Sequence, residues 1–253
     1  MIRLFVSDID GCLSAPYRPF ELDRLERLSS LSTLAGAPGD HADLPAVSIC
    51  SGRSYPYVEA MSQALGLVTP VLFEAGGGMF DPVNAVTRWH PNFTPEVRKE
   101  VDELREHVET LVGELAVEFD YAKRSQVALV GTDPGALARA LSLVERHVEE
   151  HCPHLKAYHT EVSIDVVPHV LDKLRGIEWL AERVGLSLDE IAYIGDSNGD
   201  INALRAVGRS FAPANAADSV KDVVDFVCSG NSIDGVLEAY ARCVEANRNE
   251  HTA

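Results

Sequence analysis

The hydrophobic pattern of this chain changes twice along its length. In the first part, short continuous apolar runs predict buried strands at residues 2–6, 45–50 and 71–73. Leucines at helical spacing predict a helix over residues 20–34, and a second helix is expected over residues 55–65. Strands that alternate with helices favour a parallel α/β sheet.

From residue 94 onward, each predicted helix is followed by two strands. Thr94-Pro95 is typical of a helix start, with threonine as the N-cap and proline at the first helical position. The helices are expected over residues 95–115 and 134–151, and the strand pairs over residues 116–121 with 125–130 and 155–159 with 162–166. This order predicts an antiparallel sheet with two helices on one face, inserted as a small module over residues 84–168.

After the module, the alternation of helix and strand returns. A helix is expected over residues 172–184, strands over 191–194, 209–211 and 226–228, and a last helix over 233–246 with a frayed tail behind it. The predicted fold class is therefore α/β. Residues 1–83 and 169–253 form a parallel-sheet core, which the α+β module interrupts.

The charge balance narrows the class of partner. The 253 residues include 39 acids but only 22 Lys and Arg, so the net charge is −17 and the pI about 4.8. Such a field repels phosphate backbones and anionic lipids, so we expect no nucleic acid and no membrane as partner. A small phosphate ester would also be repelled, and its site needs a metal ion and a few well-placed cations.

Three features favour a cytoplasmic location. The five cysteines are scattered without a CxxC pair, as is typical of buried thiols in a reducing compartment. The apolar stretch within residues 1–8 is too short for a signal peptide, because an acidic residue already follows at position 8. No apolar run approaches the roughly 18 residues of a membrane span.

Two carboxylates follow the first predicted strand. Because side chains alternate along a strand, Asp8 and Asp10 lie on one side of it. Two such carboxylates repel each other unless a cation neutralises them or one holds a proton. An exposed Asp-Gly turn is the ordinary alternative, and this motif alone leaves both interpretations open.

A second acidic loop follows the strand predicted over residues 191–194. Asp196 and Asp200 offer oxygen ligands that suit Mg²⁺ or Ca²⁺, at the strand end where α/β folds bind ligands. The loop also resembles the start of an EF-hand. However, Ile201 stands where that motif needs glycine and Val207 where it needs a bidentate glutamate, so we reject the EF-hand.

Two further groups complete a candidate phosphate site. Ser51-Gly52-Arg53 lies between a strand and a helix, where a hydroxyl and backbone N–H groups can face an anion. Lys173 begins the helix that returns to the sheet. Each has an ordinary alternative when taken alone, namely a turn and a solvent-exposed lysine.

Together, and in this order, these motifs resemble those of the haloacid dehalogenase superfamily of phosphohydrolases over essentially the full chain. The matched segments are Asp8-Ile9-Asp10-Gly11, Ser51-Gly52-Arg53, Lys173 and Gly195-Asp196-Ser197-Asn198-Gly199-Asp200. The resemblance implies a Rossmann-like core, a Mg²⁺ cofactor and phosphatase activity. The insertion looks like a type C2 cap, as in the Cof-type, sucrose-phosphatase-like and phosphoglycolate-phosphatase-like branches, and is most similar to the last.

The resemblance also implies a role for each matched acid. Asp8 would attack phosphorus and become an aspartyl-phosphate, and Asp10 would protonate the leaving oxygen and then activate water. Asp8, Asp196 and the backbone carbonyl of Asp10 would bind Mg²⁺. Asp200 would be a further ligand or the anchor of one.

The remaining matches imply contacts with the phosphoryl group. Ser51, Gly52 and Arg53 would hold it, and Lys173 would neutralise the charge that it shares with Asp8. Asn215 is expected in the network beside the phosphate.

Two departures from the family pattern limit what can be inferred about the substrate. Gly199 and Ala75 stand where asparagine is usual. In the cap, Lys123 and Arg124 join two predicted strands and are candidates for gripping a carboxylate or second anionic group. A charged turn in solvent is the alternative for this pair.

Two other functions use related chemistry. A receiver-like phosphoacceptor module carries its aspartate on the third strand and has no cap, whereas the third strand here ends at Phe73-Glu74. A sugar phosphomutase would transfer the phosphate to a sugar, but related mutases carry a different cap. The expected partner is a small phosphorylated metabolite. Phosphoglycolate, sugar phosphates and sugar-phosphoglycerate esters stay open, as do a monomer and a homodimer.

Overall fold

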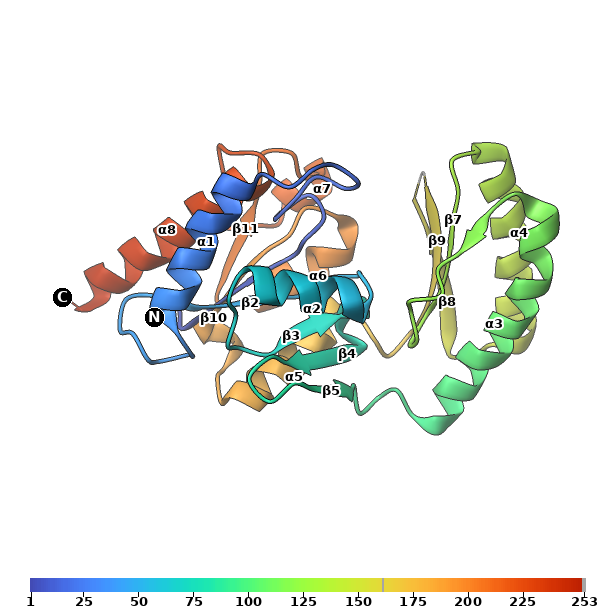
Figure 1. The fold of residues 1–253 in the computed structure, drawn as a ribbon, viewed down its shortest axis with the longest axis horizontal. Helices are drawn as coiled ribbons and strands as arrows, with labels where there is room; N and C mark the ends of the chain where they lie inside the picture. The colour runs from blue at the N-terminus through green and yellow to red at the C-terminus, as the bar shows by residue number, and fades with distance from the viewer. Residues whose placement is uncertain (161, 252–253) are drawn as a thin grey trace. The chain divides into compact units, whose positions relative to one another are not determined.

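The computed structural model describes residues 1–160 and 162–251 (Figure 1). The chain divides into two compact units: a core unit, Met1–Arg88 with Asp172–Ala253, and an inserted unit, Trp89–Leu171. The sequence placed the insertion at residues 84–168. Strand β5 (Val86–Trp89) extends a sheet of the core unit, which keeps residues 86–88 with that unit.

The main sheet of the core unit is parallel throughout, which confirms the predicted α/β class. Its strands, in spatial order, are β12 (Phe226–Val227), β11 (Arg209–Ala212), β10 (Ile191–Ile194), β1 (Leu4–Ser7) and β2 (Ala46–Ile49). All four residues of β1, β2 and β10 are buried, as continuous apolar runs predict for strands covered on both faces.

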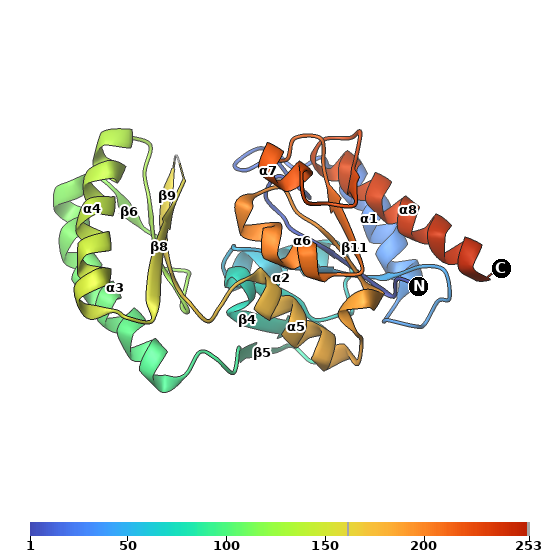
Figure 2. The ribbon, with the colours of Figure 1, turned by 180° about the vertical axis from the view of Figure 1, so that it is seen from behind.

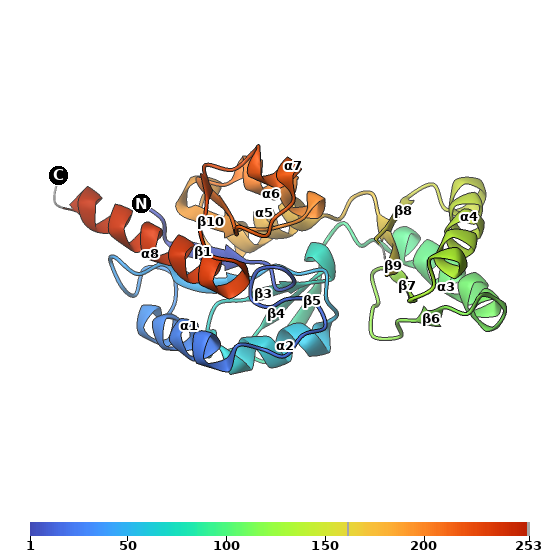
Figure 3. The same ribbon diagram turned by 90° about the horizontal axis from the view of Figure 1, so that it is seen from above.

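Helices cover both faces of this sheet. Figure 3 shows α5 (Lys173–Val184) and α6 (Ile201–Ala206) on one side and α1 (Leu22–Ala35) on the other. Side chains of β1 point alternately to the two faces of the sheet. Leu4 and Val6 belong to the buried cluster that includes α5. The Phe5 ring contacts Tyr240 of α8 (Ser232–His251), with ring centres 5.5 Å apart. Each large apolar side chain buried in this way stabilises the fold by roughly 1.5–3 kcal/mol.

A second, three-stranded sheet was not expected. It contains β3 (Val71–Phe73), β4 (Gly78–Asp81) and β5, and β4 runs antiparallel to β3. The strand at residues 71–73 was predicted correctly, but it leaves the parallel sheet apart from a bridge between Leu72 and Cys50. The run of glycines at 76–78 interrupts the apolar pattern, so the sequence did not predict the hairpin. Gly78 is needed because a Cβ there would lie 2.1 Å from the Phe73 ring.

The last helix is longer than predicted. The tail behind residue 246 was expected to fray, but α8 continues to His251. The buried Asn247 explains the difference. Its side-chain amide accepts a hydrogen bond from Ile2 N (2.8 Å) and donates to Ile2 O (2.7 Å) and Asp43 O (3.1 Å), so it ties the helix to the first strand. An unpartnered amide in this position would cost about 1–3 kcal/mol.

The inserted unit has the predicted antiparallel sheet and two helices on one face (Figure 2). Its strands, in spatial order, are β6 (Glu118–Phe119), β7 (Val127–Val130), β9 (Ser163–Pro168) and β8 (Leu155–His159). Helices α3 (Pro95–Leu115) and α4 (Pro134–His151) share a buried cluster with Leu129 and Ile164 of the sheet. Thr94 is the predicted N-cap of α3 and accepts a hydrogen bond from Val97 N at 3.4 Å. None of the described helices is long and apolar enough to cross a membrane.

Candidate active site

The predicted acids gather at one edge of the parallel sheet. Strands β1 and β10 are paired in register, with Ser7 opposite Ile194. The residues that follow the two strands therefore lie at the same edge. This register brings Asp8 together with Asp196 and Asp200, which each offer a carboxylate oxygen within 4.8 Å of one another.

Lys173 joins two of these acids. Its Nζ donates to Asp8 Oδ2 at 2.5 Å and to Asp200 Oδ1 at 2.6 Å, and all three side chains are buried. Helix α5 positions the lysine because Asp172 caps the helix by accepting a hydrogen bond from Arg175 N. One buried cation thus lies between two buried carboxylates, and Asp196 adds a third negative group beside them.

Asp200 is held by its own loop as well as by Lys173. Its Oδ2 accepts from Asp196 N (3.2 Å), Ser197 N (2.9 Å) and Ser197 Oγ (2.8 Å), while Oδ1 also accepts from the Tyr193 hydroxyl. A carboxylate has roughly four lone-pair sites, and these donors use them. Asp200 is therefore better suited to anchoring Lys173 and the loop than to binding a metal directly. The sequence did not identify Tyr193 as part of this site.

Two glycines provide the space that the acids occupy. A Cβ on Gly11 would lie 2.0 Å from Asp196 Oδ2, and a Cβ on Gly195 would lie 2.5 Å from the Asp200 carboxyl carbon. Gly11 also has a φ of 74°, in the left-handed region that side chains disfavour. The Asp-Gly and Gly-Asp pairs of the two motifs are thus a packing requirement of the carboxylate cluster.

The electrostatics differ between the acids. Burial, with the nearby carboxylates, raises the pKa of Asp8 to about 6 despite Lys173, and that of Asp196 to about 7. Burial acts on Asp200 in the same direction, but Lys173 and the hydrogen-bond donors outweigh it and lower the pKa. Burial opposes the charge on Lys173, yet Asp200 and Asp8 raise its pKa well above the usual value. The site therefore carries excess negative charge that a cation would relieve.

The donor set fits Mg²⁺. Asp8 and Asp196 present hard carboxylate oxygens, which this ion prefers. Among residues 1–160 and 162–251, none donates a hydrogen bond to the Asp196 carboxylate. A half-buried carboxylate with a raised pKa and no hydrogen-bond donor among the described residues is suited to binding a cation.

This electrostatic pattern predicts how Mg²⁺ stabilisation varies with pH. The folded pKa values of Asp8 and Asp196 lie above the usual value of about 3.9 for aspartate, so the folded protein binds more protons than the unfolded chain between about pH 4 and 7. Without metal, the free energy of unfolding should fall as pH rises through this window. The contribution of Asp200 lies below it, because its pKa is lowered. Mg²⁺ should relieve the charge, so its stabilising effect should grow over the same window.

Thermal unfolding from about pH 5 to about pH 8, with and without Mg²⁺, measures this effect. Asp196→Asn should flatten the slope, whereas Asp189→Asn, which changes an exposed acid of the same unit, should not. A Mg²⁺ shift that is independent of pH would contradict the assignment of these acids to the metal.

The Ser51-Gly52-Arg53 turn lies beside the acids, but its arginine makes a different contact from the one expected. Arg53 does not stand free for a phosphate. Its Nε and Nη2 donate to Asp10 Oδ2 and Oδ1, both at 2.6 Å. Ser51 is buried, and its Oγ accepts from Arg53 N at 3.3 Å. The structure thus links Arg53 to the expected acid–base residue.

The end of β3 holds this turn in place. Glu74 N donates to Arg53 O at 2.9 Å and Ala75 N to Ser51 O at 2.8 Å. Glu74 and Ala75 both have left-handed backbone angles, with φ of 49° and 55°. Asparagine tolerates this conformation better than alanine, which accounts for the asparagine expected at position 75.

Asn215, expected beside the phosphate, has its amide occupied within the core unit. Its Nδ2 donates to Gly11 O at 2.9 Å, and its Oδ1 accepts from Ser232 N at 2.6 Å. It thereby ties the first acidic loop to the start of α8. A structural role accounts for both contacts.

The two cap cations lie in the inserted unit. Lys123 Nζ donates to Asp165 Oδ1 at 2.6 Å, so its charge is already paired, and Arg124 is exposed. Arg105 of α3 donates to the backbone carbonyls of both residues, at 3.4 and 3.2 Å. The sequence pointed to this loop but missed Asp165 and Arg105.

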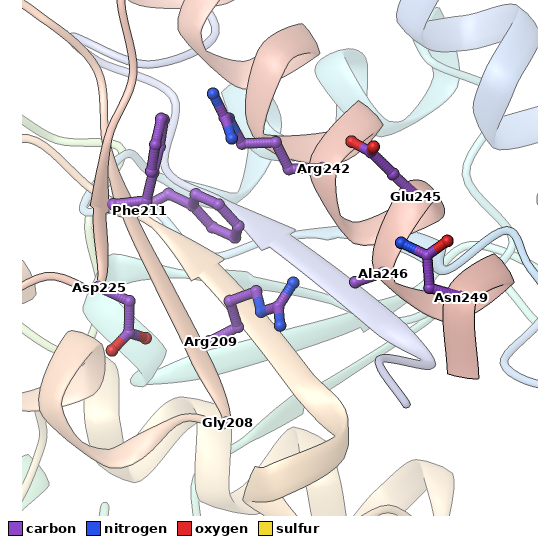
Figure 4. A pocket seen from close by; sticks show the side chains of 9 residues that line it. Gly208, Arg209, Phe211, Asp225, Arg242, Glu245, Ala246 and Asn249 are labelled. Atoms are coloured by element: carbon purple, nitrogen blue, oxygen red, sulfur yellow. The ribbon is translucent and has the colours of Figure 1, made fainter. Parts of the chain in front are cut away.

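A cavity of about 570 Å³ opens elsewhere on the core unit, between α8 and the edge of the parallel sheet (Figure 4). It lies at the beginning of β11, whereas the acids follow the ends of β1 and β10. Arg209 and Arg242 line it, and no predicted site residue does. The predicted site residues lie in and around the carboxylate cluster and not in this cavity.

Comparisons with known proteins agree with the motifs. A model of haloacid dehalogenase-like hydrolases matches residues 138–239. A phosphoglycolate phosphatase of Thermoplasma volcanium is 26% identical over 241 residues, which cover 95% of this chain and 98% of the relative. Two solved structures share the fold. A Thermoplasma acidophilum protein has a TM-score of 0.76 with 24% identity, covering 96% of this chain and 98% of that one. The sucrose-phosphatase of Synechocystis, solved with sucrose and phosphate, has a TM-score of 0.67 with 17% identity, covering 96% and 98%.

The motifs, the family model and the full-length relatives all point to one family. The acids, the serine turn and Lys173 occur in the order of its sequence motifs, and the fold brings the acids and the lysine into contact. The chain is similar to haloacid dehalogenase-like hydrolases over residues 138–239 and to phosphoglycolate phosphatases over nearly its full length.

Proposed function

We propose that Asp8 takes the phosphoryl group from a small phosphorylated metabolite in a Mg²⁺-dependent hydrolysis. The enzyme is a phosphatase of its superfamily, and its full-length relatives are phosphoglycolate phosphatases. The observation that carries the mechanism is the buried bridge of Lys173 between Asp8 and Asp200, with Asp196 beside it.

Asp8 is oriented for attack by two donors. Ile9 N donates to its Oδ1 at 2.6 Å, and Lys173 donates to Oδ2. These contacts fix the carboxylate at the end of β1, so little ordering is left for the reaction. Lys173 also offsets negative charge that builds up when a phosphate approaches Asp8.

Asp8, Asp196 and the backbone carbonyl of Asp10 would hold Mg²⁺. When bound, the ion neutralises the carboxylates and polarises the phosphoryl group. Because the chain carries a net charge of −17, this local positive charge is what lets it accept an anionic substrate.

Asp10 would act twice. In the first step an oxygen of Asp8 bonds to phosphorus, the ester P–O bond breaks, and the Asp10 carboxyl gives its proton to the leaving oxygen. In the second step the Asp10 carboxylate takes a proton from water as the water oxygen bonds to phosphorus and the bond to Asp8 breaks. Phosphate leaves and Asp8 is regenerated.

For the substrate we propose 2-phosphoglycolate or a sugar phosphate. The named activity of the relatives supports the first, and the sucrose-phosphatase that shares the fold supports the second.

A panel of phosphate esters tests this function. The purified protein should release phosphate from p-nitrophenyl phosphate and from at least one of the two proposed substrate classes. Chelation of Mg²⁺ should abolish this activity, and added Mg²⁺ should restore it. Full activity in excess chelator, or no hydrolysis of any ester with Mg²⁺ present, would refute the proposal.

A further inference from the structure

We propose that Arg53, which contacts the rings of Tyr17 and Tyr57, is a positioning residue that orients the Asp10 carboxyl group for proton transfer. The inference rests on the proposed phosphatase function. It differs from the sequence-based expectation, in which Arg53 holds the phosphate. It also gives a role to Tyr17 and Tyr57, which no sequence motif identified.

The contact between Arg53 and Asp10 is bidentate. Nε and Nη2 donate to the two oxygens of Asp10, both at 2.6 Å, in the fork geometry that suits a carboxylate. The Arg53 and Asp10 side chains are 23% and 30% exposed, so the pair is partly shielded from water. Both donor groups of this fork are used on Asp10. In this arrangement they are not available to a phosphate.

Two aromatic rings fix the arginine. The guanidinium carbon lies 4.8 Å from the centre of the Tyr17 ring and 5.0 Å from that of Tyr57, within the range of a cation–π contact. Phe20 extends the group, with its ring centre 6.4 Å from that of Tyr57. Arg53 thus contacts two aromatic rings and also donates two hydrogen bonds to Asp10. These contacts together leave its side chain few alternative conformations.

The backbone of Tyr17 indicates that this contact has a function. Its φ is 56°, a left-handed conformation that is unfavourable for a bulky residue. Tyr17 is also 73% exposed, so burial compensates little of this strain. Strained residues of this kind concentrate at functional sites. Here the strained backbone places an aromatic ring on the arginine that holds Asp10.

The arrangement suits both proton transfers. The unprotonated Asp10 accepts both hydrogen bonds of the fork. Once a carboxyl oxygen has taken a proton from solvent or water, the other oxygen can still accept from Arg53. The remaining bond keeps the proton-bearing oxygen directed at one place. Without Arg53, the carboxyl would rotate among its rotamers and be correctly placed for a smaller part of the time.

The leaving group of the substrate tests this role. p-Nitrophenolate leaves without needing a proton, whereas the alkoxide of glycerol 2-phosphate needs one. Arg53→Lys should therefore lower kcat/KM for glycerol 2-phosphate about tenfold more than for p-nitrophenyl phosphate, since general acid catalysis as a whole contributes about 10²–10⁴-fold. Tyr17→Leu should shift the same ratio about threefold, and Tyr17→Phe, which keeps the ring, by less than about twofold.

A matched control removes the same kind of contact far from Asp10. Arg242 stacks on Phe226, 3.5 Å from the ring centre, and pairs with Glu238, in the cavity region of Figure 4. Arg242→Lys should leave the ratio of the two kcat/KM values unchanged.

Tyr17→Gly relieves the backbone strain, so it should raise Tm and still shift the ratio as Tyr17→Leu does.

Two results would overturn the proposal. If Arg53→Lys lowers kcat/KM equally for both esters, Arg53 holds the phosphate or merely supports the fold. If Tyr17→Leu leaves the ratio at the wild-type value, the contact between the Tyr17 ring and Arg53 has no part in proton transfer. Failure of the proposed function looks different, because the wild-type protein would then hydrolyse neither ester with Mg²⁺ present.

Discussion

Asp8→Asn is expected to abolish hydrolysis of every phosphate ester and to leave the fold intact. An amide oxygen is too weak a nucleophile to form the covalent intermediate, so kcat should fall by a factor on the order of 10⁴ or more. The variant should be at least as stable as the wild type above about pH 6 without metal. The substitution removes a buried charge whose pKa is raised, and Lys173 keeps Asp200 as its partner.

Steady-state rates with p-nitrophenyl phosphate and thermal unfolding measure these two effects. Asp189→Asn provides the control, because it makes the same chemical change at an exposed position of the core unit. That variant should keep wild-type activity. Mg²⁺-dependent turnover in Asp8→Asn at more than a trace of the wild-type rate would remove Asp8 as the nucleophile.

Lys173→Met should affect both stability and catalysis. The lysine is buried between Asp8 and Asp200, and a similar-sized apolar residue would leave both carboxylates without their cation. Removing one member of a buried ion pair costs about 3–5 kcal/mol. Catalysis should fall by about 10²–10³, because the charge that offsets the phosphate is lost.

Urea unfolding and kcat measure the two effects of this change. Lys99→Met is the matched control, since Lys99 is exposed in α3 and pairs with Glu103 at 3.3 Å. An exposed pair of this kind contributes about 0–1 kcal/mol. Mg²⁺ should stabilise Lys173→Met more than the wild type, because the ion then faces more uncompensated charge. Near-normal stability and rate in Lys173→Met would remove the lysine from the site.

The sequence predicted the parts of the fold that local pattern specifies. Strands β1, β2 and β10 are continuous apolar runs, and the inserted unit repeats helix, strand and strand with clear helix starts at Thr94 and Asp133. The α1 helix was also predicted. Yet its leucines recur every third residue and drift around the helix, so Leu25 and Leu28 are buried while Leu22 and Leu34 are exposed.

Features that depend on distant residues could not be predicted. The end of α8 is fixed by Asn247, which bonds to Ile2 at the other end of the sequence. The hairpin of β3 and β4 needs Gly78 only because the Phe73 ring occupies the space beside it. Neither requirement has a local signature.

The same distinction holds for the candidate active site. The motifs identified the acids, Lys173 and the serine turn, since each lies at a strand end or a helix start. They could not specify that Tyr193 donates to Asp200, or that Arg53 pairs with Asp10 rather than standing free. The rings of Tyr17 and Tyr57 both contact Arg53, and the left-handed backbone of Tyr17 is part of this arrangement. The pattern of apolar residues does not predict such contacts.

Chemical trapping tests most directly whether the phosphoryl group is carried on Asp8. The enzyme is quenched during turnover of p-nitrophenyl phosphate with Mg²⁺ present, and borohydride reduces any acyl phosphate before peptide mass spectrometry. We predict that Asp8 is converted to homoserine, and that the conversion requires both substrate and Mg²⁺. Conversion of another carboxylate, or a quenched and turning-over enzyme with Asp8 unmodified, would contradict the account.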